Sequence, residues 1–468
     1  MTQLGTKENP LRVAIIGAGP TGFYAADFLL KHKNYVIQVD MYDRLPTPFG
    51  LVRGGVAPDH QKIKTVTKAF DKTAKHPNFR FFGYVELGKD VMVADLRQHY
   101  HQILYTVGAS TDRKLGIPGE DLIGSRTATE FVAWYNGHPD YRDYEFNLDS
   151  HENVAIVGVG NVAVDVARIL CRTQGELNET DIADHAQAAL ARSSIKNIYM
   201  LGRRGPAQAA FTNTEVRELG ELLGADTVVL ADEAKLDPLS QQELTVSNDR
   251  LLNQKVEIIQ EFTHKPRTDK PRTLTLRFLV SPVELIGDEN GHIKAMRLVK
   301  NELYQAERGG LGARATDQFE ELPVTLAFRS VGYQGVPLAD VPFDAKRGVI
   351  ANQGGRVIDL ESKQPILGEY TAGWIKRGAN GIIGTNKPDA VETANAMLAD
   401  MAEGKVLNPT APTAAAITAF IAARQPCYFT YDDWSTLDKL EVSKGEAEGR
   451  PRYKFTQIAD MLAAVGKL

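Results

Sequence analysis

Cysteine is nearly absent from this sequence. Among its 468 residues, only Cys171 and Cys427 carry a thiol. Two thiols are too few for a disulfide framework, a zinc site or the four-thiolate ligation of an iron-sulfur cluster. We therefore expect no bound metal and a reducing compartment.

Long apolar runs and a strong excess of one charge are also absent. No segment approaches the roughly 18 apolar residues that a spanning helix needs. The first ten residues, MTQLGTKENP, have neither the apolar core of an export signal nor the Arg-rich pattern of an import signal. The formal net charge of −5 provides no general attraction to nucleic acid or an anionic membrane. We expect a cytoplasmic monomer with no nucleic-acid partner and no membrane span.

The chain does have length and an ordinary apolar content. With 468 residues, of which 43% are hydrophobic and 24% are charged, it is too long for one core. This composition excludes a disordered or fibrous protein. Two globular domains are the natural expectation.

A glycine-rich turn follows the first apolar, β-branched run. Gly17, Gly19 and Gly22 lead into a helix-like stretch and then a second apolar run over residues 35–42. The first glycine allows a tight turn, the second lets a pyrophosphate approach the backbone, and the third allows close helix packing. Asp43 ends the second run, where a carboxylate can accept hydrogen bonds from ribose hydroxyls. The pattern predicts a βαβ unit that binds a dinucleotide at the helix N-terminus.

The glycine spacing alone has little weight, because it recurs elsewhere in the chain. Gly310, Gly312 and Ala315 match it with a terminal alanine, but no apolar strand precedes them. We expect that segment to be a loop. The first turn differs from a plain structural turn by its strand, helix, second strand and terminal acid.

A second βαβ unit begins at the apolar run 153–157. Gly158, Gly160 and Ala163 follow it, and the sequence predicts a helix from Asn161 onward. Two such turns in one chain imply two nucleotides. The later stretch GELNETDIADHAQAALARSS has the composition of an additional helical insertion.

The next apolar run, IKNIYML, ends in a pair of arginines. Arg203 and Arg204 stand where a site for NAD would carry an acid. Two guanidiniums at this position can bind the 2′-phosphate of NADP, which a carboxylate would repel. The alternative is a solvated basic turn. The place of the pair in the βαβ unit favours the NADP interpretation.

Seven segments together resemble the adrenodoxin-reductase-like ferredoxin–NADP reductases. They follow that family's order over nearly the whole chain: GAGPTGFYAADFLL, PFGLVRGGVAPDH, DRKLGIPGEDL, GVGNVAVDVARIL, GRRGPAQAAFTNTEVREL, RSVGY and GWIKRGANGIIGTNK. The second and fifth segments are the specific ones, because many flavoproteins share the glycine turns. The resemblance implies an FAD enzyme that carries electrons between NADPH and a ferredoxin or adrenodoxin-type iron-sulfur protein.

The resemblance also implies the domain organisation. The fold class would be α/β, with two Rossmann-like dinucleotide-binding domains of the three-layer ββα type. Strand-to-glycine exits near residues 108 and 332 would mark crossings between the domains. The FAD domain would then comprise residues 1–107 and 333–468, and the NADP domain residues 108–332. We expect the last sixty or so residues to form two helices of a cover without a catalytic role.

Specific positions acquire roles from the family's pattern. The residues that would line FAD are Gly17, Ala18, Gly19, Gly22, Asp43, Leu51, Leu87, Trp374, Gly381, Ile382 and Ile383. The residues that would meet NADP are Gly158, Gly160, Asn161, Val162, Arg203, Arg204, Glu215 and Gly381.

Three candidate residues of the site also have a purely structural interpretation. His60 and Glu215 are candidate catalytic residues near the flavin, yet His60 could be a hydrogen-bonded structural histidine and Glu215 an exposed helix carboxylate. Trp374 occupies the position where many two-dinucleotide flavoproteins have an acid. We expect its ring to pack on the cofactor, and a buried structural tryptophan is the alternative.

Other functions compete with the reduction of an iron-sulfur protein. A disulfide reductase needs a cysteine pair beside the flavin, which PFGLVRGGVAPDH does not contain. A flavin-dependent NADPH monooxygenase, another NADPH-dependent diaphorase and a nucleotide-sensing regulator stay as alternatives. Reduction of a ferredoxin by NADPH would distinguish the first function from all of them.

Overall fold

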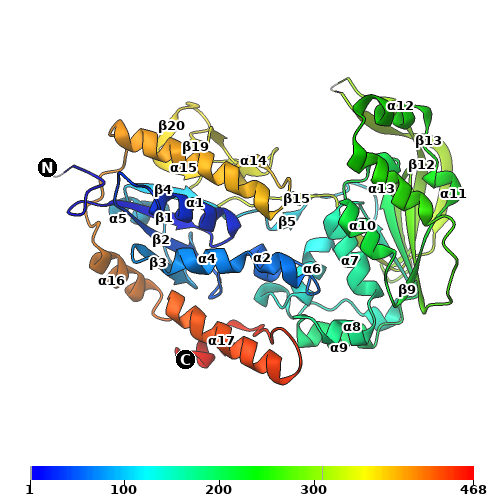
Figure 1. The fold of residues 1–468 in the computed structure, drawn as a ribbon, viewed down its shortest axis with the longest axis horizontal. Coiled ribbons are helices and arrows are strands. Elements are labelled where there is room, and N and C mark those ends of the chain that lie inside the picture. Colours follow the sequence, from blue (N-terminus) through cyan, green and yellow to red (C-terminus); the bar gives the residue numbers. More distant parts are fainter. Residues whose placement is uncertain (1–2, 308) are drawn as a thin grey trace. The chain divides into compact units, whose positions relative to one another are not determined.

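A computed structural model describes residues 3–307 and 309–468 (Figure 1). Backbone contacts divide the chain into two compact units. Unit 1 comprises the chain up to Thr111 together with Asn136–Pro139 and Tyr333–Leu468, and unit 2 comprises Asp112–Tyr135 and Asp140–Gly332. Each unit has its own sheets and its own apolar clusters. The domain boundaries predicted above, with one nucleotide for each domain, stay a prediction.

Unit 1 is built on a seven-stranded sheet with the order β18-β19-β20-β4-β1-β2-β3. The five strands from β20 to β3 run parallel, and the short β18 and β19 are antiparallel. The strands of this sheet are β1 (Leu11–Ile16), β2 (Ile37–Asp43), β3 (Phe79–Gly83), β4 (Gln102–Tyr105), β18 (Asn352–Gln353), β19 (Arg356–Ile358) and β20 (Pro365–Thr371). A separate two-stranded sheet consists of β16 (Phe343–Asp344) and β17 (Val349–Ile350). Short strands β5 (Thr111–Asp112) and β15 (Tyr333–Gln334) lie at the chain crossings.

The central strand β1 is apolar except for Arg12, because both faces of the sheet are covered. Val13 and Ile15 belong to the cluster under the helices, whereas Ala14 and Ile16 belong to the cluster on the opposite face.

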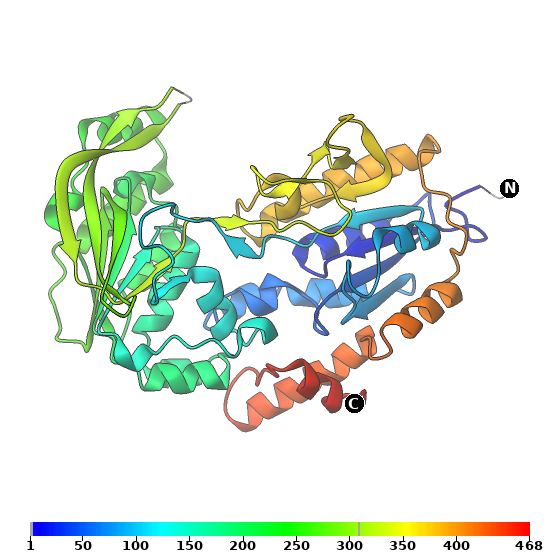
Figure 2. The same cartoon turned by 180° about the vertical axis from the view of Figure 1, so that it is seen from behind.

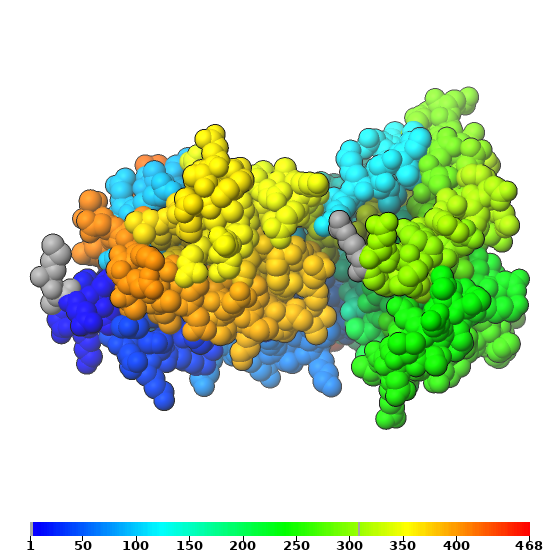
Figure 3. All heavy atoms as spheres, turned by 90° about the horizontal axis from the view of Figure 1, so that it is seen from above, coloured from blue at the N-terminus to red at the C-terminus, as the bar shows by residue number. Residues whose placement is uncertain are grey.

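Figure 3 shows α15 at the surface of this unit, beside the yellow residues of β19 and β20. The helices are α1 (Pro20–Leu30), α2 (Leu51–Gly54), α3 (Gln61–Lys64), α4 (Thr67–Ala74), α5 (Val93–His99), α14 (Trp374–Arg377), α15 (Asn386–Ala402), α16 (Ala414–Arg424), α17 (Tyr431–Ala447) and α18 (Ile458–Ala464).

Unit 2 has three layers. Its parallel sheet has the order β6-β14-β7-β8-β10-β9, and a separate antiparallel sheet has the order β11-β12-β13. The strands are β6 (Ser125–Thr127), β7 (Asn153–Val157), β8 (Asn197–Gly202), β9 (Ala225–Val229), β10 (Arg272–Phe278), β11 (Val280–Gly287), β12 (Ile293–Gln305), β13 (Leu311–Leu322) and β14 (Leu326–Arg329). Figure 2 shows the antiparallel sheet, in light green, beside the parallel one.

Alternate residues of β7 separate the two apolar clusters of unit 2. Val154 and Ile156 pack in the cluster that contains the helices, and Ala155 and Val157 pack in the cluster that contains the antiparallel sheet. The helices are α6 (Ala128–Tyr135), α7 (Asn161–Cys171), α8 (Gln174–Asn178), α9 (Asp184–Ala191), α10 (Asn213–Leu219), α11 (Ala231–Ala234), α12 (Pro238–Ser247) and α13 (Arg250–Glu261). The parallel sheet, helices and antiparallel sheet agree with the expected ββα architecture.

Local expectations can be compared with these elements. The helix predicted from Asn161 begins there, and the insertion after it is helical as α8 and α9. The expectation of a loop at Gly310, Gly312 and Ala315 is wrong for the last two, which lie in β13 and pair with β12. The segment is a hairpin, so it is still not a βαβ turn.

The end of the chain forms a third helix in addition to the two expected. The short α18 follows α17, and its Met461 and Leu462 are buried in the cluster of unit 1. Among the residues that the structure describes, no helix is both long and apolar enough to cross a membrane.

Candidate functional site

The first glycine turn joins β1 to α1 in unit 1. Gly17 has a φ of 108°, and a Cβ at this position would stand 2.7 Å from the carbonyl oxygen of Thr106. Glycine is therefore required by the backbone itself. Gly19 is the N-cap of α1 without a side-chain cap, and a Cβ there would meet no atom within 4 Å. The open space beside an uncapped helix N-terminus fits the pyrophosphate of a dinucleotide.

Asp43 is held directly beneath this turn. Its Oδ2 accepts a hydrogen bond of 2.9 Å from the N–H of Ala18, and its Oδ1 accepts one of 2.9 Å from the N–H of Leu45. Burial raises the pKa of the Asp43 carboxyl, although these two donors favour its ionised form. Each carboxylate oxygen can accept a further hydrogen bond. Asp43 thus shapes the turn and keeps acceptor capacity for a ribose.

Two later segments reach the same end of α1. The N–H of Phe49 donates to the carbonyl oxygen of Ala18 at 2.7 Å, and a Cβ at Gly50 would lie 3.0 Å from the Cα of Gly19. A Cβ at Gly373 would collide with the side chain of Thr21. The structure therefore brings the first turn, the segment that carries Leu51 and the segment that carries Trp374 together within unit 1.

Trp374 is half-buried, and the choice between a ring that packs on the cofactor and a structural tryptophan stays open. Its ring stacks on Tyr333 with centroids 5.4 Å apart, and its Nε1 donates to the carbonyl oxygen of Asn380 at 3.2 Å. Gly381 is exposed with a φ of 81°, and Ile382 is 61% exposed. An exposed isoleucine beside a glycine turn is an apolar surface that a flat ring could cover.

The remaining expected FAD residues occupy ordinary positions. Leu51 begins α2 and is exposed, Leu87 is half-buried, and Ile383 begins the short helical turn before α15. Leu87 follows Val85, whose N–H donates to the carbonyl oxygen of Asp43 at 2.9 Å. These facts agree with a lining role and do not test it.

His60 is the N-cap residue of α3 and is half-buried. Its N–H donates to the carbonyl oxygen of Ala57 at 3.0 Å, and its carbonyl oxygen accepts from the N–H of Ile63 at 3.1 Å. The backbone of His60 thus belongs to a compact turn. The choice between a catalytic and a structural imidazole stays open as a prediction.

The second glycine turn, in unit 2, repeats the geometry of the first. Gly158 has a φ of 134°, and a Cβ there would overlap the carbonyl oxygen of Ser330. Gly160 is the N-cap of α7 without a side-chain cap, and a Cβ on it would meet nothing within 4 Å. This turn therefore also fits a pyrophosphate. Val162 follows in the first turn of α7 and is half-buried against the cluster that contains the helices.

The arginine pair stands at the end of β8, as predicted. Arg203 is exposed and Arg204 is half-buried. In the described part of the chain, neither guanidinium forms an ion pair; Arg204 only makes long contacts to the carbonyl oxygens of Leu311 and Gln208, at 3.4 and 3.5 Å. Burial and the neighbouring Arg203 lower the pKa of Arg204. Two adjacent cations without a carboxylate partner fit a phosphate ligand.

Glu215 lies in the first turn of α10, and the alternative interpretation of it as an exposed helix carboxylate is wrong. Its side chain is 12% exposed and contacts the guanidinium of Arg168 at 3.3 Å. Arg168 is fully buried and also pairs with Asp165 at 2.7 Å and Glu218 at 3.1 Å. Asn161 connects the start of α10 to the second glycine turn, because its Oδ1 accepts a hydrogen bond of 2.9 Å from the N–H of Thr212.

Sequence reasoning missed Arg168. Its only signal was a charged residue on the buried face of an apolar helix, three positions after an aspartate. A fully buried arginine requires carboxylate partners. That requirement explains why α7 and α10, which carry the two sides of the predicted NADP site, are joined by an ion-pair cluster.

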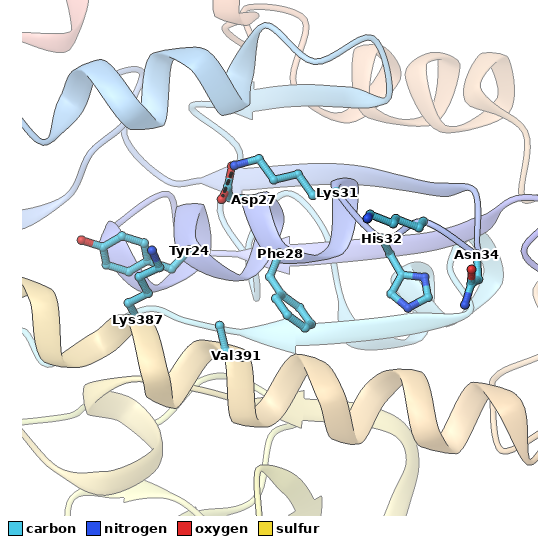
Figure 4. Close-up of a pocket in the computed structure, with 9 residues that line it drawn as sticks. Tyr24, Asp27, Phe28, Lys31, His32, Asn34, Lys387 and Val391 are labelled. Carbon is cyan, nitrogen blue, oxygen red and sulfur yellow. Dashed lines mark hydrogen bonds and ion pairs between the residues drawn. The ribbon is translucent and has the colours of Figure 1, made fainter.

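A surface pocket of about 410 Å³ lies elsewhere in unit 1. In Figure 4, Tyr24 and Phe28 of α1 face Lys387 and Val391 of α15, and Lys31 pairs with Asp27. The pocket is at the C-terminal half of α1, whereas the glycine turn is at its N-terminus. It is therefore separate from the candidate nucleotide site.

Comparisons with known proteins show what this chain is similar to. A family model described as "Pyridine nucleotide-disulphide oxidoreductase" matches residues 11–199. The protein "NADPH-ferredoxin reductase FprA" of Mycobacterium tuberculosis is 42% identical over 97% of this chain and 98% of its own length. The mitochondrial "NADPH:adrenodoxin oxidoreductase" of Arabidopsis thaliana is 38% identical over 97% of this chain and 95% of its own length.

A solved structure shares the fold. The structure of Mycobacterium tuberculosis FprA in complex with NADPH has a TM-score of 0.91 and 41% identity, over 98% of this chain and 100% of that one. Similarity at this level extends through both units, beyond the part that the family model matches.

Proposed function

The chain belongs to the family of NADPH-ferredoxin and NADPH:adrenodoxin oxidoreductases, and from this premise we propose that it reduces an iron-sulfur protein of the ferredoxin type with NADPH. It is an oxidoreductase that uses FAD and NADP(H). The observation that carries the proposal is the difference between the two strand ends: Asp43 follows one glycine turn, and the unpaired Arg203 and Arg204 follow the other.

The chemistry of the two substrates explains why a flavin is needed. FAD, when bound, takes the electron pair of a hydride from NADPH and passes the electrons singly to an iron-sulfur protein. Transfer of this kind depends on alignment of the rings more than on an acid or a base. The task of the protein is therefore to bind two dinucleotides and to hold their rings in place.

The residues of unit 1 would hold FAD. The uncapped N-terminus of α1 would bind its pyrophosphate, and Asp43 would accept from its ribose while it holds Ala18. Trp374, Gly381, Ile382 and Ile383 would contact its ring system. We propose His60 as a polar neighbour of that ring.

The residues of unit 2 would hold NADP(H). The N-terminus of α7 would bind the pyrophosphate, and Arg203 and Arg204 would bind the 2′-phosphate. Glu215 would approach the nicotinamide amide, since the cluster around Arg168 fixes its carboxylate in one place. This ion pairing favours a positioning function for Glu215.

The partner and the cellular setting belong to the same proposal. The exposed Arg217 on α10 is a candidate contact for an acidic carrier protein. A cytoplasmic location and a monomeric state stay predictions from the sequence.

The decisive experiment is an anaerobic titration of the purified protein with NADPH, followed by an oxidised ferredoxin. We expect a yellow protein that bleaches with NADPH and regains its colour as the ferredoxin is reduced. A protein that bleaches but reduces only oxygen, with a hydroxylated product, would be a monooxygenase. A colourless protein that binds NADP without turnover would be a nucleotide sensor.

A further inference from the structure

The segment that follows β2 adopts a backbone that needs support. Phe49 has a φ of 83°, a conformation that a bulky side chain rarely adopts, and Gly50 continues at 49°. Phe49 is also the residue whose N–H donates to Ala18 in the first glycine turn, at 2.7 Å. Such a conformation persists only where the surrounding structure over-determines it. The residues that pack against this segment therefore help to hold the first glycine turn in its conformation.

Helix α17, from the end of the chain, supplies much of that support (Figure 1). Its Trp434 packs edge-on against the ring of Phe49 with centroids 5.7 Å apart. The same indole lies under the guanidinium of Arg53, 5.2 Å from the ring centroid. Both ends of the Phe49–Arg53 segment thus rest on one side chain of α17.

Glu441, two turns further along α17, binds Arg53 directly. Its carboxylate is fully buried and accepts from both terminal nitrogens of Arg53, at 2.7 and 2.6 Å. It also accepts from Arg452 at 2.7 Å and from the N–H of Phe455 at 2.9 Å. This bidentate (two-pronged) contact fixes the orientation of the Arg53 guanidinium as well as its distance from the carboxylate.

The charges of this cluster are balanced within it. Burial alone would raise the pKa of Glu441, but Arg53 and Arg452 outweigh burial and hold that pKa below its ordinary value. The carboxylate of Glu441 is therefore ionised. Together with Asp438, which pairs with Arg452 at 2.7 Å, it balances the charges of the two arginines. Lys454 completes the contact, since its Nζ donates to the carbonyl oxygen of Arg53 at 3.3 Å and to Oδ1 of Asn136 at 3.0 Å.

We propose that Glu441, acting through Arg53, is a positioning residue of the flavin site, and that α17 holds the segment Phe49–Arg53 against the FAD pyrophosphate turn. The C-terminal part of the chain is thus a component of the cofactor site and more than a cover. The inference rests on the proposed function, because it takes Leu51 and its neighbours to contact FAD.

The first test compares two buried carboxylates of unit 1. Asp400 resembles Glu441, since it accepts from both Nε and Nη2 of Arg356, at 2.7 and 2.8 Å, but it lies on α15 and outside the segment. We expect Glu441→Gln to weaken FAD binding to the apoprotein about tenfold and to change the shape of the visible flavin absorption band. Asp400→Asn should lower the melting temperature similarly and leave both readouts unchanged.

The second test uses the two arginines that share Glu441. Arg53→Gln should weaken FAD binding about as much as Glu441→Gln does, whereas Arg452→Gln should stay within about twofold of the wild type. Arg53→Lys keeps a charge but loses the two-pronged contact, so it should fold and show an intermediate loss. Wild-type FAD affinity in Arg53→Lys and Glu441→Gln, or an equal loss in Asp400→Asn, would overturn the proposal.

The outcomes separate this inference from the proposed function. A wild-type protein that takes up no FAD would contradict the proposed function itself. A wild-type protein that binds FAD normally, together with unaffected Glu441→Gln and Arg53→Gln variants, would contradict only the positioning role. Binding of 2′,5′-ADP should be the same in all the variants, because it depends on unit 2.

Discussion

The two glycine turns have the same backbone and different surroundings. Gly17 and Gly158 both have positive φ values, 108° and 134°, and both lie against the carbonyl oxygen of a residue at a strand exit. The helices α1 and α7 begin three residues later, and their N-cap glycines, Gly19 and Gly160, have no protein atom where a Cβ would stand. The backbone thus provides a pyrophosphate site in either unit and does not select a nucleotide.

The selection lies at the next strand end. In unit 1, the half-buried Asp43 faces the turn and, when ionised, donates no hydrogen bond. In unit 2, Arg203 and Arg204 together have ten N–H donors, and neither forms an ion pair within the described residues. A 2′-phosphate would be repelled by the first arrangement and bound by the second. The comparison teaches that specificity resides in the side chains at the end of the strand that follows each turn.

The largest expected effect comes from the arginine pair. Arg203→Ala with Arg204→Ala should lower kcat/KM for NADPH about 100-fold, because the 2′-phosphate would lose a charged hydrogen bond from each guanidinium. The same protein should use NADH nearly as well as before. The control is Arg192→Ala with Arg297→Ala, which removes two exposed arginines of unit 2. An unchanged preference for NADPH would contradict the NADP assignment.

The second expected effect concerns the open glycines. Gly160→Ala should weaken NADP binding about 30-fold with a small change in melting temperature, since its Cβ meets no protein atom but occupies the path of the phosphate. Gly19→Ala should do the same to FAD binding. Gly158→Ala, by contrast, should destabilise the protein, because its Cβ would overlap Ser330. Equal melting temperatures for Gly158→Ala and Gly160→Ala would refute this division of roles.

The third prediction concerns the acid of unit 1. Asp43→Ala should raise the dissociation constant of FAD about tenfold, because it removes an acceptor for the ribose and for the N–H of Ala18. Affinity for 2′,5′-ADP, measured by calorimetry, should stay as in the wild type. A selective loss of NADP affinity in this variant would mean that the two sites have been exchanged.

The smallest expected effect is a dependence of FAD retention on pH. Burial raises the pKa of Asp43, so its carboxylate takes up a proton at a higher pH than an exposed aspartate does. As the pH falls through that raised value, the acceptor is lost and FAD should dissociate a few-fold more readily. Asp43→Asn should lack this step in a fluorescence titration of released FAD. A step of the same size in Asp43→Asn would assign it to another group.

Short-range features of the fold were predictable from the residues. The apolar run before Gly17 is a strand because both faces of its sheet are buried, and α7 begins at Asn161 because a glycine precedes an amphipathic stretch. The third match to the glycine spacing, at Gly310, is not preceded by an apolar strand, so the sequence does not predict a nucleotide site there. The sequence also gives no indication of the hairpin that this segment forms. The paired strands β12 and β13 have no clear alternation of apolar and polar residues. Periodicity therefore did not predict them as strands.

Side-chain partners were much less predictable. The local sequence indicates only one of the three carboxylates that bind Arg168, namely Asp165. It does not indicate Glu215 or Glu218, nor that Glu441 binds an arginine 388 positions earlier. Partners of this kind are chosen by burial, since a charge removed from water must find its counter-charge wherever the fold provides one. For the same reason Glu215 is held in an ion-pair cluster rather than exposed on its helix.

The sequence by itself determined the two nucleotide turns, because glycine backbone, strand, helix and strand-end charge are encoded within each βαβ unit. It also determined the family, through motifs such as PFGLVR and GRRGP. Only the tertiary structure decided what supports those turns. The placement of Trp434 and Glu441 beneath Phe49 and Arg53 depends on long-range packing of the last helices, which no local pattern specifies.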